Sequence, residues 1–183
     1  MIPLVMWSLH WRKDFIAFTS EEISRTETCI VGITGGTVIN GLLETLNSPE
    51  YIERVNWERI FFVWTDERFL PQSHEDNYFN RVKPYLLCKA KGAAHFFPIN
   101  TNSKTVIEAA DEYEKEIGNV LKACKKSGLD LAILDLGEDG HTAGLFAGSH
   151  ALRVADRNVV PVEDGKVWDR IFMTFSFLAK PDV

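Results

Sequence analysis

The most promising group for chemistry in this sequence is a histidine enclosed by glycine and acidic residues. His141 ends the segment Gly137-Glu138-Asp139-Gly140-His141, which follows an apolar run at 131–134. An imidazole can take a proton from water near neutral pH, and glycine lets the backbone turn sharply to present the ring. We therefore identify His141 as a candidate general base, which the acids just before it, Glu138 and Asp139, can orient. A structural histidine is the alternative.

A second segment combines glycine with hydroxyl groups. Thr34-Gly35-Gly36-Thr37 follows an apolar run at 29–33 and precedes a helical pattern. Backbone N–H groups at such a strand-to-helix turn form a natural anion site. The segment is neither a P-loop nor a G-x-G-x-x-G motif. It predicts a phosphate site, or else a tight turn that needs positive φ.

A third segment, Asp66-Glu67-Arg68, follows the apolar run at 60–64. Its guanidinium can bind a phosphate or stabilise an oxyanion, and its carboxylates can support that group or move a proton. A solvated charged loop is the other interpretation of so short a charge run.

The elements that must position these segments alternate between short apolar runs and helical patterns, which predicts an α/β fold with a mostly parallel sheet. In such a sheet the carboxyl ends of the strands meet at one edge, so the three segments can converge on one pocket. We also expect a short strand at 15–18 and a capping box opening a helix at Thr19. The remaining expected elements are a long helix within 104–126, ending at Ser127-Gly128, and strands at 159–162 and 171–175.

Bulk properties narrow the class of protein. The chain has 183 residues, 45% of them hydrophobic and 25% charged, which is typical of one globular domain. A net charge of −6 argues against a nucleic-acid partner. Cys29, Cys88 and Cys124 show no metal-binding or disulfide spacing. With no signal-peptide or membrane-span pattern, we expect a cytoplasmic protein that does not associate with membranes.

Together, the three segments resemble the 6-phosphogluconolactonase family. Its members carry, in this order, a Ser-Gly-Gly-Ser-Thr-Pro-like loop, an Asp-Glu-Arg segment and a Gly-Glu-Asp-Gly-His-Thr-Ala-Ser-Leu-Phe segment. Asp76-Asn77-Tyr78 is similar to the family's Ser-Asn-Tyr, and Arg170-Ile171 with Thr174 to a later strand. Asp135 stands where the family usually has glycine. The resemblance covers roughly residues 30–178.

The resemblance implies a three-layer α/β sandwich with a mostly parallel, Rossmann-like sheet. It also implies hydrolysis of 6-phospho-D-glucono-1,5-lactone to 6-phosphogluconate in the pentose phosphate pathway, without a metal or other cofactor. The implied catalytic residues are His141, Asp139, Asp66 and Arg68. The implied substrate-binding residues are Thr34, Gly35, Gly36, Thr37, Asn77, Gly140 and Arg170.

Two other functions stay open. One is that of the related glucosamine-6-phosphate deaminases, which share the Asp-Gly-His core. Their histidine is typically followed by Ile-Ala-Phe-Asn-Glu, whereas His141 is followed by Thr-Ala-Gly-Leu-Phe. The other is a catalytically weak sugar-phosphate-binding protein.

Members of the family continue, past the position that matches Val183, through further helices and a lysine-bearing segment. We therefore expect residues 1–183 to form a single lactonase-like domain that is incomplete at its C-terminus. In that case the apolar side chains of Phe172, Met173, Phe175 and Phe177 should be exposed.

Overall fold

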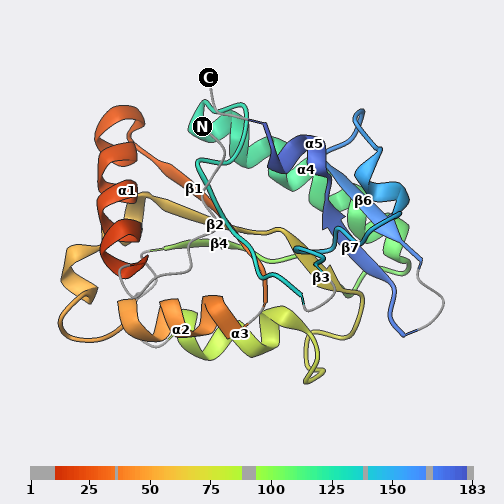
Figure 1. Cartoon of the computed structure of the whole chain (residues 1–183), viewed down its shortest axis with the longest axis horizontal. Coiled ribbons are helices and arrows are strands. Elements are labelled where there is room, and N and C mark those ends of the chain that lie inside the picture. The colour runs from red at the N-terminus through yellow and green to blue at the C-terminus, as the bar shows by residue number, and fades with distance from the viewer. Residues whose placement is uncertain (1–10, 36, 88–93, 138–139, 164–166, 181–183) are drawn as a thin grey trace.

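A computed structural model describes residues 11–35, 37–87, 94–137, 140–163 and 167–180 (Figure 1). The helices are α1 (Trp11–Thr26), α2 (Thr37–Leu46), α3 (Tyr78–Leu87), α4 (Val106–Cys124) and α5 (Phe175–Leu178), with short 3₁₀ turns at Ile52–Arg54, Trp57–Arg59 and His150–Leu152. The strands are β1 (Cys29–Ile33), β2 (Ile60–Trp64), β3 (Asp66–Arg68), β4 (His95–Phe97), β5 (Leu131–Ile133), β6 (Val159–Val162) and β7 (Arg170–Met173).

The larger sheet is entirely parallel and has the strand order β4-β2-β1-β5. Its two central strands are apolar runs, and β1 is buried along its whole length. Strands buried on both faces are typical of parallel sheets covered by helices. The predicted parallel sheet, with strands from 29–33, 60–64 and the region of 131–134, is therefore confirmed.

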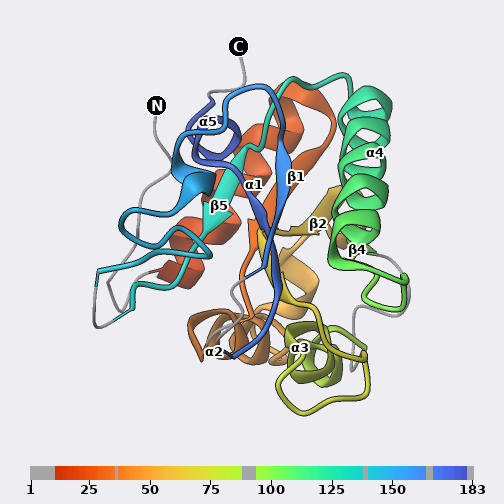
Figure 2. The same ribbon diagram turned by 90° about the vertical axis from the view of Figure 1, so that its right-hand side faces the viewer.

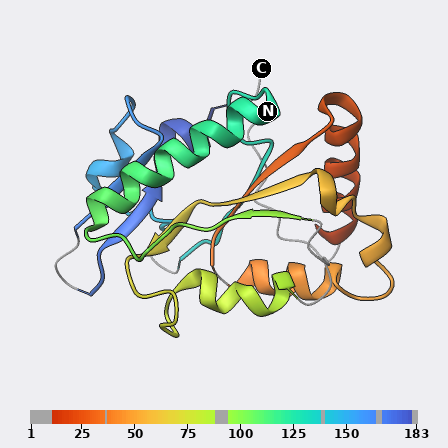
Figure 3. The ribbon, with the colours of Figure 1, turned by 180° about the vertical axis from the view of Figure 1, so that it is seen from behind.

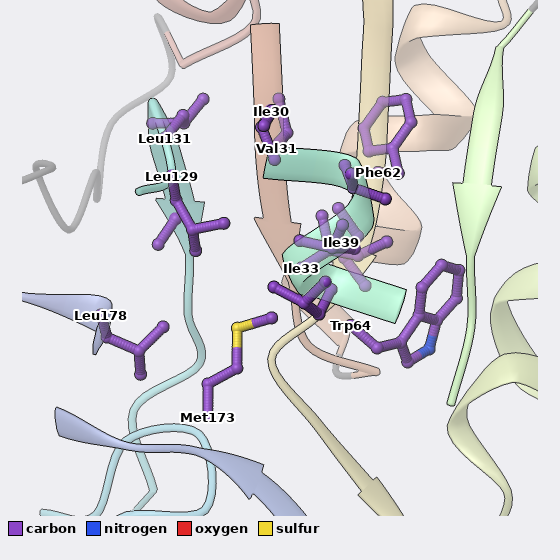
Figure 4. Packing of buried hydrophobic residues seen from close by; sticks show 14 of the residues in the cluster. Ile30, Val31, Ile33, Ile39, Phe62, Trp64, Leu129, Leu131, Met173 and Leu178 are labelled. Atoms are coloured by element: carbon purple, nitrogen blue, oxygen red, sulfur yellow. The ribbon is translucent and has the colours of Figure 1, made fainter. Parts of the chain in front are cut away.

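The sheet is the middle layer of three. The helices α2 and α3 lie side by side on one of its faces, and α4 crosses the other (Figures 1 and 3). Ile30, Ile33 and Trp64 of the central strands pack in this core with Ile39 of α2, as Figure 4 shows. The expected α/β sandwich is confirmed.

A second, three-stranded sheet with the order β3-β7-β6 is antiparallel. It packs against α4, and β3 enters it directly from the end of β2 (Figures 1 and 2). The strand signal at 159–162 is confirmed. The signal at 171–175 ends earlier, because Thr174 accepts a hydrogen bond from the backbone N–H of Phe177 and caps α5.

The expected strand at 15–18 is wrong, since these residues belong to the helix α1. Phe15, Ile16 and Thr19 are buried at helical spacing. The Thr19 hydroxyl donates to the carbonyl of Phe15, 2.8 Å away, so it bonds back along the helix and does not cap a new one.

The expected helix within 104–126 is confirmed as α4, and Thr105 caps its N-terminus. The helix ends before the expected Ser127-Gly128, because Lys125 adopts a left-handed conformation at φ 56°. None of the described helices is long and apolar enough to cross a membrane.

A buried cation joins three elements at the amino ends of the parallel strands. The ammonium of Lys126 donates to Glu22 of α1 at 2.8 Å and to Asp130 at 2.6 Å. The other oxygen of Asp130 accepts the N–H of Ile30 in β1 at 2.7 Å. The Lys126 and Asp130 side chains are each 1% exposed. This network ties α1 and the end of α4 to the sheet.

The expected exposure of apolar groups near the end of the chain is wrong for three of four residues. Phe172, Met173 and Phe177 are buried, and only Phe175 is exposed. Phe172 and Met173 lie on β7, the middle strand of the second sheet, which α4 covers. Phe177 lies on α5, which packs against the 3₁₀ turn His150–Leu152.

Candidate active site

The carboxyl ends of three parallel strands meet at one edge of the sheet, as the sequence pattern predicts. The N–H of Thr65, after β2, donates to the carbonyl of Ile33 in β1 at 2.9 Å. The N–H of Thr34, after β1, lies 3.4 Å from the carbonyl of Ile133 in β5. The glycine turn, the Asp-Glu-Arg segment and the segment leading to His141 therefore start from adjacent strand ends.

Asp66 is buried where β2 passes into β3. Its Oδ1 lies 3.3 Å from the hydroxyl of Thr65, and the Thr34 hydroxyl also hydrogen-bonds the carboxyl. Burial raises the pKa of Asp66 above its usual range, although the bond from Thr34 and the charge of Arg170 lower it. The structure thus brings together Thr34, Asp66 and Arg170, three of the predicted site residues.

Arg68 and Arg170 face each other across the antiparallel pair formed by β3 and β7. Like charges directly opposite each other destabilise a strand pair. The Nε atom of each guanidinium is buried without a hydrogen-bond partner. Arg68 is bound on one side, by an ion pair between its Nη1 and Oδ1 of Asp76 at 2.9 Å. Two arginines at opposed strand positions bring positive charge together, which suits a doubly charged anion such as a phosphate.

Glu67, which was not among the implied site residues, is fully buried next to Arg68 on β3. Its carboxyl accepts the backbone N–H of Arg68, Tyr78 and Phe79 at 2.8, 2.8 and 2.9 Å. It thereby caps the N-terminus of α3 from a different strand. Burial raises the pKa of Glu67 to about 8, against the effect of these three N–H groups. The sequence signal that could have indicated a role for Glu67 is its place in the charged segment Asp66-Glu67-Arg68 after a buried strand.

Tyr78, the first residue of α3, touches two of the three segments. The Arg68 guanidinium lies over its ring, 4.9 Å from the centroid. A Cβ atom at Gly35 would stand 2.1 Å from Cβ and Cγ of Tyr78. Gly35 must therefore be glycine because of this ring, and its backbone needs no positive φ. Burial and the nearby charge of Asp66 raise the pKa of Tyr78, while the two arginines lower it.

His141 is half-buried after a turn in which Gly140 has φ 83°. The turn is closed by a 2.8 Å hydrogen bond from the N–H of Gly137 to the carbonyl of His141. The imidazole stacks on Phe146, with 4.2 Å between ring centroids. The Arg170 guanidinium lies over that same phenyl ring, 5.4 Å from its centroid. The candidate base His141 and Arg170 therefore both pack against the ring of Phe146.

Asn77 is buried and engaged within the protein. Its Oδ1 accepts the N–H of Asn80 at 3.0 Å, and its amide donates to the carbonyl of Leu70 at 3.3 Å. These contacts cap α3, and a contact with the substrate stays a prediction. Gly36 and Asp139 lie outside the described residues, as does the side chain of Thr37.

Asp135 follows β5 and was not predicted as a site residue. The backbone N–H of Val38, in the first turn of α2, hydrogen-bonds its carboxyl. Its Oδ1 is buried without a partner. Burial raises the pKa of Asp135, and its charge in turn raises the pKa of Asp66. The Asp135 carboxylate thus lies at the N-terminus of α2, where the sequence predicted a phosphate. Because this negative charge would repel a phosphate, the arginine pair is favoured as the phosphate site.

Within the described part of the chain, no three His, Cys, Asp or Glu side chains are grouped so that they could hold a metal ion. The groups that do converge are a histidine, two arginines and buried carboxyls. Such a set can bind an anionic substrate and move a proton at a carbonyl centre.

Comparisons with known proteins identify relatives of this chain. The chain is 30% identical over 156 residues to 6-phosphogluconolactonase 3, chloroplastic, of Arabidopsis thaliana, which covers 80% of the chain and 47% of that protein. It is 31% identical over 166 residues to the probable 6-phosphogluconolactonase 1 of Oryza sativa subsp. japonica, covering 84% and 55% respectively. The chain thus spans about half the length of these curated relatives.

Solved structures show the same fold. A 6-phosphogluconolactonase from Shewanella baltica superposes with a TM-score of 0.77 at 19% identity, over 93% of this chain and 71% of that one. One from Thermotoga maritima gives 0.71 at 26% identity, over 90% and 72%. The sequence profile of the glucosamine-6-phosphate isomerases/6-phosphogluconolactonase family matches residues 8–182. The chain therefore belongs to this family.

Proposed function

We propose that the chain hydrolyses 6-phospho-D-glucono-1,5-lactone to 6-phosphogluconate. The observation that carries this proposal is the opposed pair Arg68 and Arg170. Arg170 contacts the same Phe146 ring as His141. The two guanidinium groups supply charge and directed donors for the phosphate. The imidazole supplies a base for attack on the lactone, and the names of the similar proteins fit the same substrate.

In the proposed reaction His141 takes a proton from water while the water oxygen bonds to the lactone carbonyl carbon. The tetrahedral intermediate then collapses, and the ring C–O bond breaks. The proton passes from His141 to the departing ring oxygen, which leaves a carboxylic acid that ionises in solution. Asp139 would orient the imidazole, and Asp66 would support Arg170. Ester hydrolysis needs only water, a base and charge stabilisation, so we assign no cofactor.

The decisive variant is His141→Asn, measured as lactone hydrolysis above the spontaneous rate. Loss of a positioned general base should lower kcat by about 10²–10⁴-fold. His95→Asn is the matched control, because His95 lies on β4, stacked on Phe61. An unchanged kcat in folded His141→Asn would remove the histidine from the mechanism.

The alternative substrate is tested in the same samples. Release of ammonia from glucosamine 6-phosphate would identify a deaminase and refute the lactonase proposal. The cytoplasmic location also stays a proposal, since one similar plant protein is chloroplastic by name. Fractionation of cells that express this protein decides it.

A further inference from the structure

Tyr78 lies between the groups that the proposed reaction uses, yet that reaction assigns it no part. Its ring is covered by the Arg68 guanidinium on one side. Elsewhere the ring meets the backbone of Gly35 so closely that even a methyl group there would overlap it. The phenol also interacts electrostatically with Asp66 and Arg170. Through these contacts, Tyr78 can fix the position of Arg68 relative to the turn at Gly35.

The backbone of Tyr78 is held independently of its ring. The buried Glu67 carboxyl accepts the N–H of Tyr78 and the next N–H along α3, at 2.8 and 2.9 Å. Glu67 also accepts the N–H of Arg68 at 2.8 Å. One carboxyl therefore fixes the main chain at both ends of the Arg68–Tyr78 stack, and the ring is clamped against Gly35.

Arg68 needs such a support because its ion pair with Asp76 is weak. The Asp76 carboxylate is 41% exposed, so water screens this ion pair. The opposing Arg170 repels Arg68 when no anion lies between them. A flat aromatic face under the guanidinium opposes that repulsion and limits its rotation.

We infer that Tyr78 is a positioning residue, whose ring holds the Arg68 guanidinium opposite Arg170 in the geometry that binds the phosphate of the ligand. The inference rests on the proposed function only for the identity of that ligand. The ring carries the effect, so phenylalanine should serve in its place. The role acts on binding, and the chemical step at His141 should be largely independent of it.

The first test needs no ligand. Protons above an aromatic face resonate upfield, so the side-chain NMR signals of Arg68 should be shifted upfield in the wild type and in Tyr78→Phe. In Tyr78→Leu they should return to ordinary values. Tyr85→Leu, the same change on the same helix, is the matched control and should leave them in place. Arg68 signals that are ordinary in the wild type, or unchanged in Tyr78→Leu, would overturn the inference.

The second test is calorimetric binding of 6-phosphogluconate, with gluconate as the ligand that lacks the phosphate. Tyr78→Leu should weaken 6-phosphogluconate binding by about 2- to 30-fold, the range for loss of one cation–π contact. Tyr78→Phe should remain near the wild type. In an Arg68→Leu background, Tyr78→Leu should cost nothing further, because the ring acts through the guanidinium.

Several results would refute the positioning role. These are equal weakening in Tyr78→Phe and Tyr78→Leu, additive losses in the double variant, or a fall in kcat at saturating lactone with KM unchanged. The fate of the proposed function is separate. If the lactone is not hydrolysed but the NMR and binding pattern holds, the lactonase proposal fails and the role of Tyr78 stands.

Discussion

The substitution Lys126→Met tests how the far end of the sheet is held together. Methionine keeps most of the length of the side chain and removes the ammonium. That ammonium donates to Glu22 at 2.8 Å, to Asp130 at 2.6 Å and to the Thr26 hydroxyl at 2.8 Å. In the variant, the carboxylates of Glu22 and Asp130 no longer have this positive charge beside them.

The size of the effect follows from how enclosed each carboxylate is. Glu22 is 10% exposed and keeps its ion pair with Arg25 at 3.0 Å. Asp130 is 1% exposed and keeps the hydrogen bond from the N–H of Ile30. Removing one member of a buried ion pair costs about 3–5 kcal/mol. Against a typical domain stability of about 5–15 kcal/mol, such a loss is readily measured.

The effect should also depend on pH. Burial raises the pKa of Glu22, but hydrogen bonds from Lys126, Thr26 and Arg25 outweigh it and lower the pKa to about 2. In the wild type the ionised Glu22 carboxylate stabilises the fold at pH values above 4.5, the ordinary pKa of a glutamate. This contribution is lost as the pH falls towards the folded-state pKa of about 2. Burial raises the pKa of Asp130 to about 6, and loss of the ammonium should raise it further. In the variant Asp130 therefore takes up a proton as pH falls, which relieves part of the penalty.

The assay is urea unfolding at pH 7.5 and pH 5, followed by circular dichroism. The free-energy gap between wild type and Lys126→Met should be about 3–5 kcal/mol at pH 7.5 and smaller at pH 5. Lys122→Met, at an exposed position of the same helix, is the control and should change stability by less than about 0.5 kcal/mol. A gap below about 1 kcal/mol at pH 7.5, or one that widens in acid, would refute the reasoning.

Two further predictions concern the site. Gly35→Ala should destabilise the protein by about 1–3 kcal/mol, because the new Cβ would overlap the ring of Tyr78. Gly118→Ala, where a Cβ meets nothing within 4 Å in α4, should instead stabilise it by about 0.5–1 kcal/mol, and urea unfolding of both variants checks the contrast. Asp135→Asn removes a negative charge that raises the pKa of Asp66, so a carboxyl NMR titration should show that pKa fall. A rise would contradict the assigned proximity.

Much of the fold follows from local pattern. The runs at 29–33 and 60–64 are apolar enough to be read as strands buried on both faces, and both are. The stripe of α4 repeats at helical spacing and is buried along it. The misread segment at 15–18 shows the limit of this reasoning. Four residues cannot distinguish a strand from one turn of a helix.

Other elements carry no such pattern. The helix α3 contains Pro84, which disfavours a helix interior. Its N-terminus depends on Glu67, which lies on the strand β3. The strand β3 has only three residues, all charged, and it exists because β7 pairs with it. Elements of this kind are decided by distant partners, which no local window contains.

The division is the same at the candidate site. By itself, the sequence determined the residue types: a histidine between glycines, an Asp-Glu-Arg segment and a glycine turn, each placed after a buried strand. Only the tertiary structure decided which of them act together. It set Arg68 opposite Arg170, put Tyr78 beneath one guanidinium and against Gly35, and placed Asp135 at the start of α2. The physical reason is that side-chain chemistry is a local property, whereas charge pairing, stacking and burial depend on segments that meet only when the chain folds.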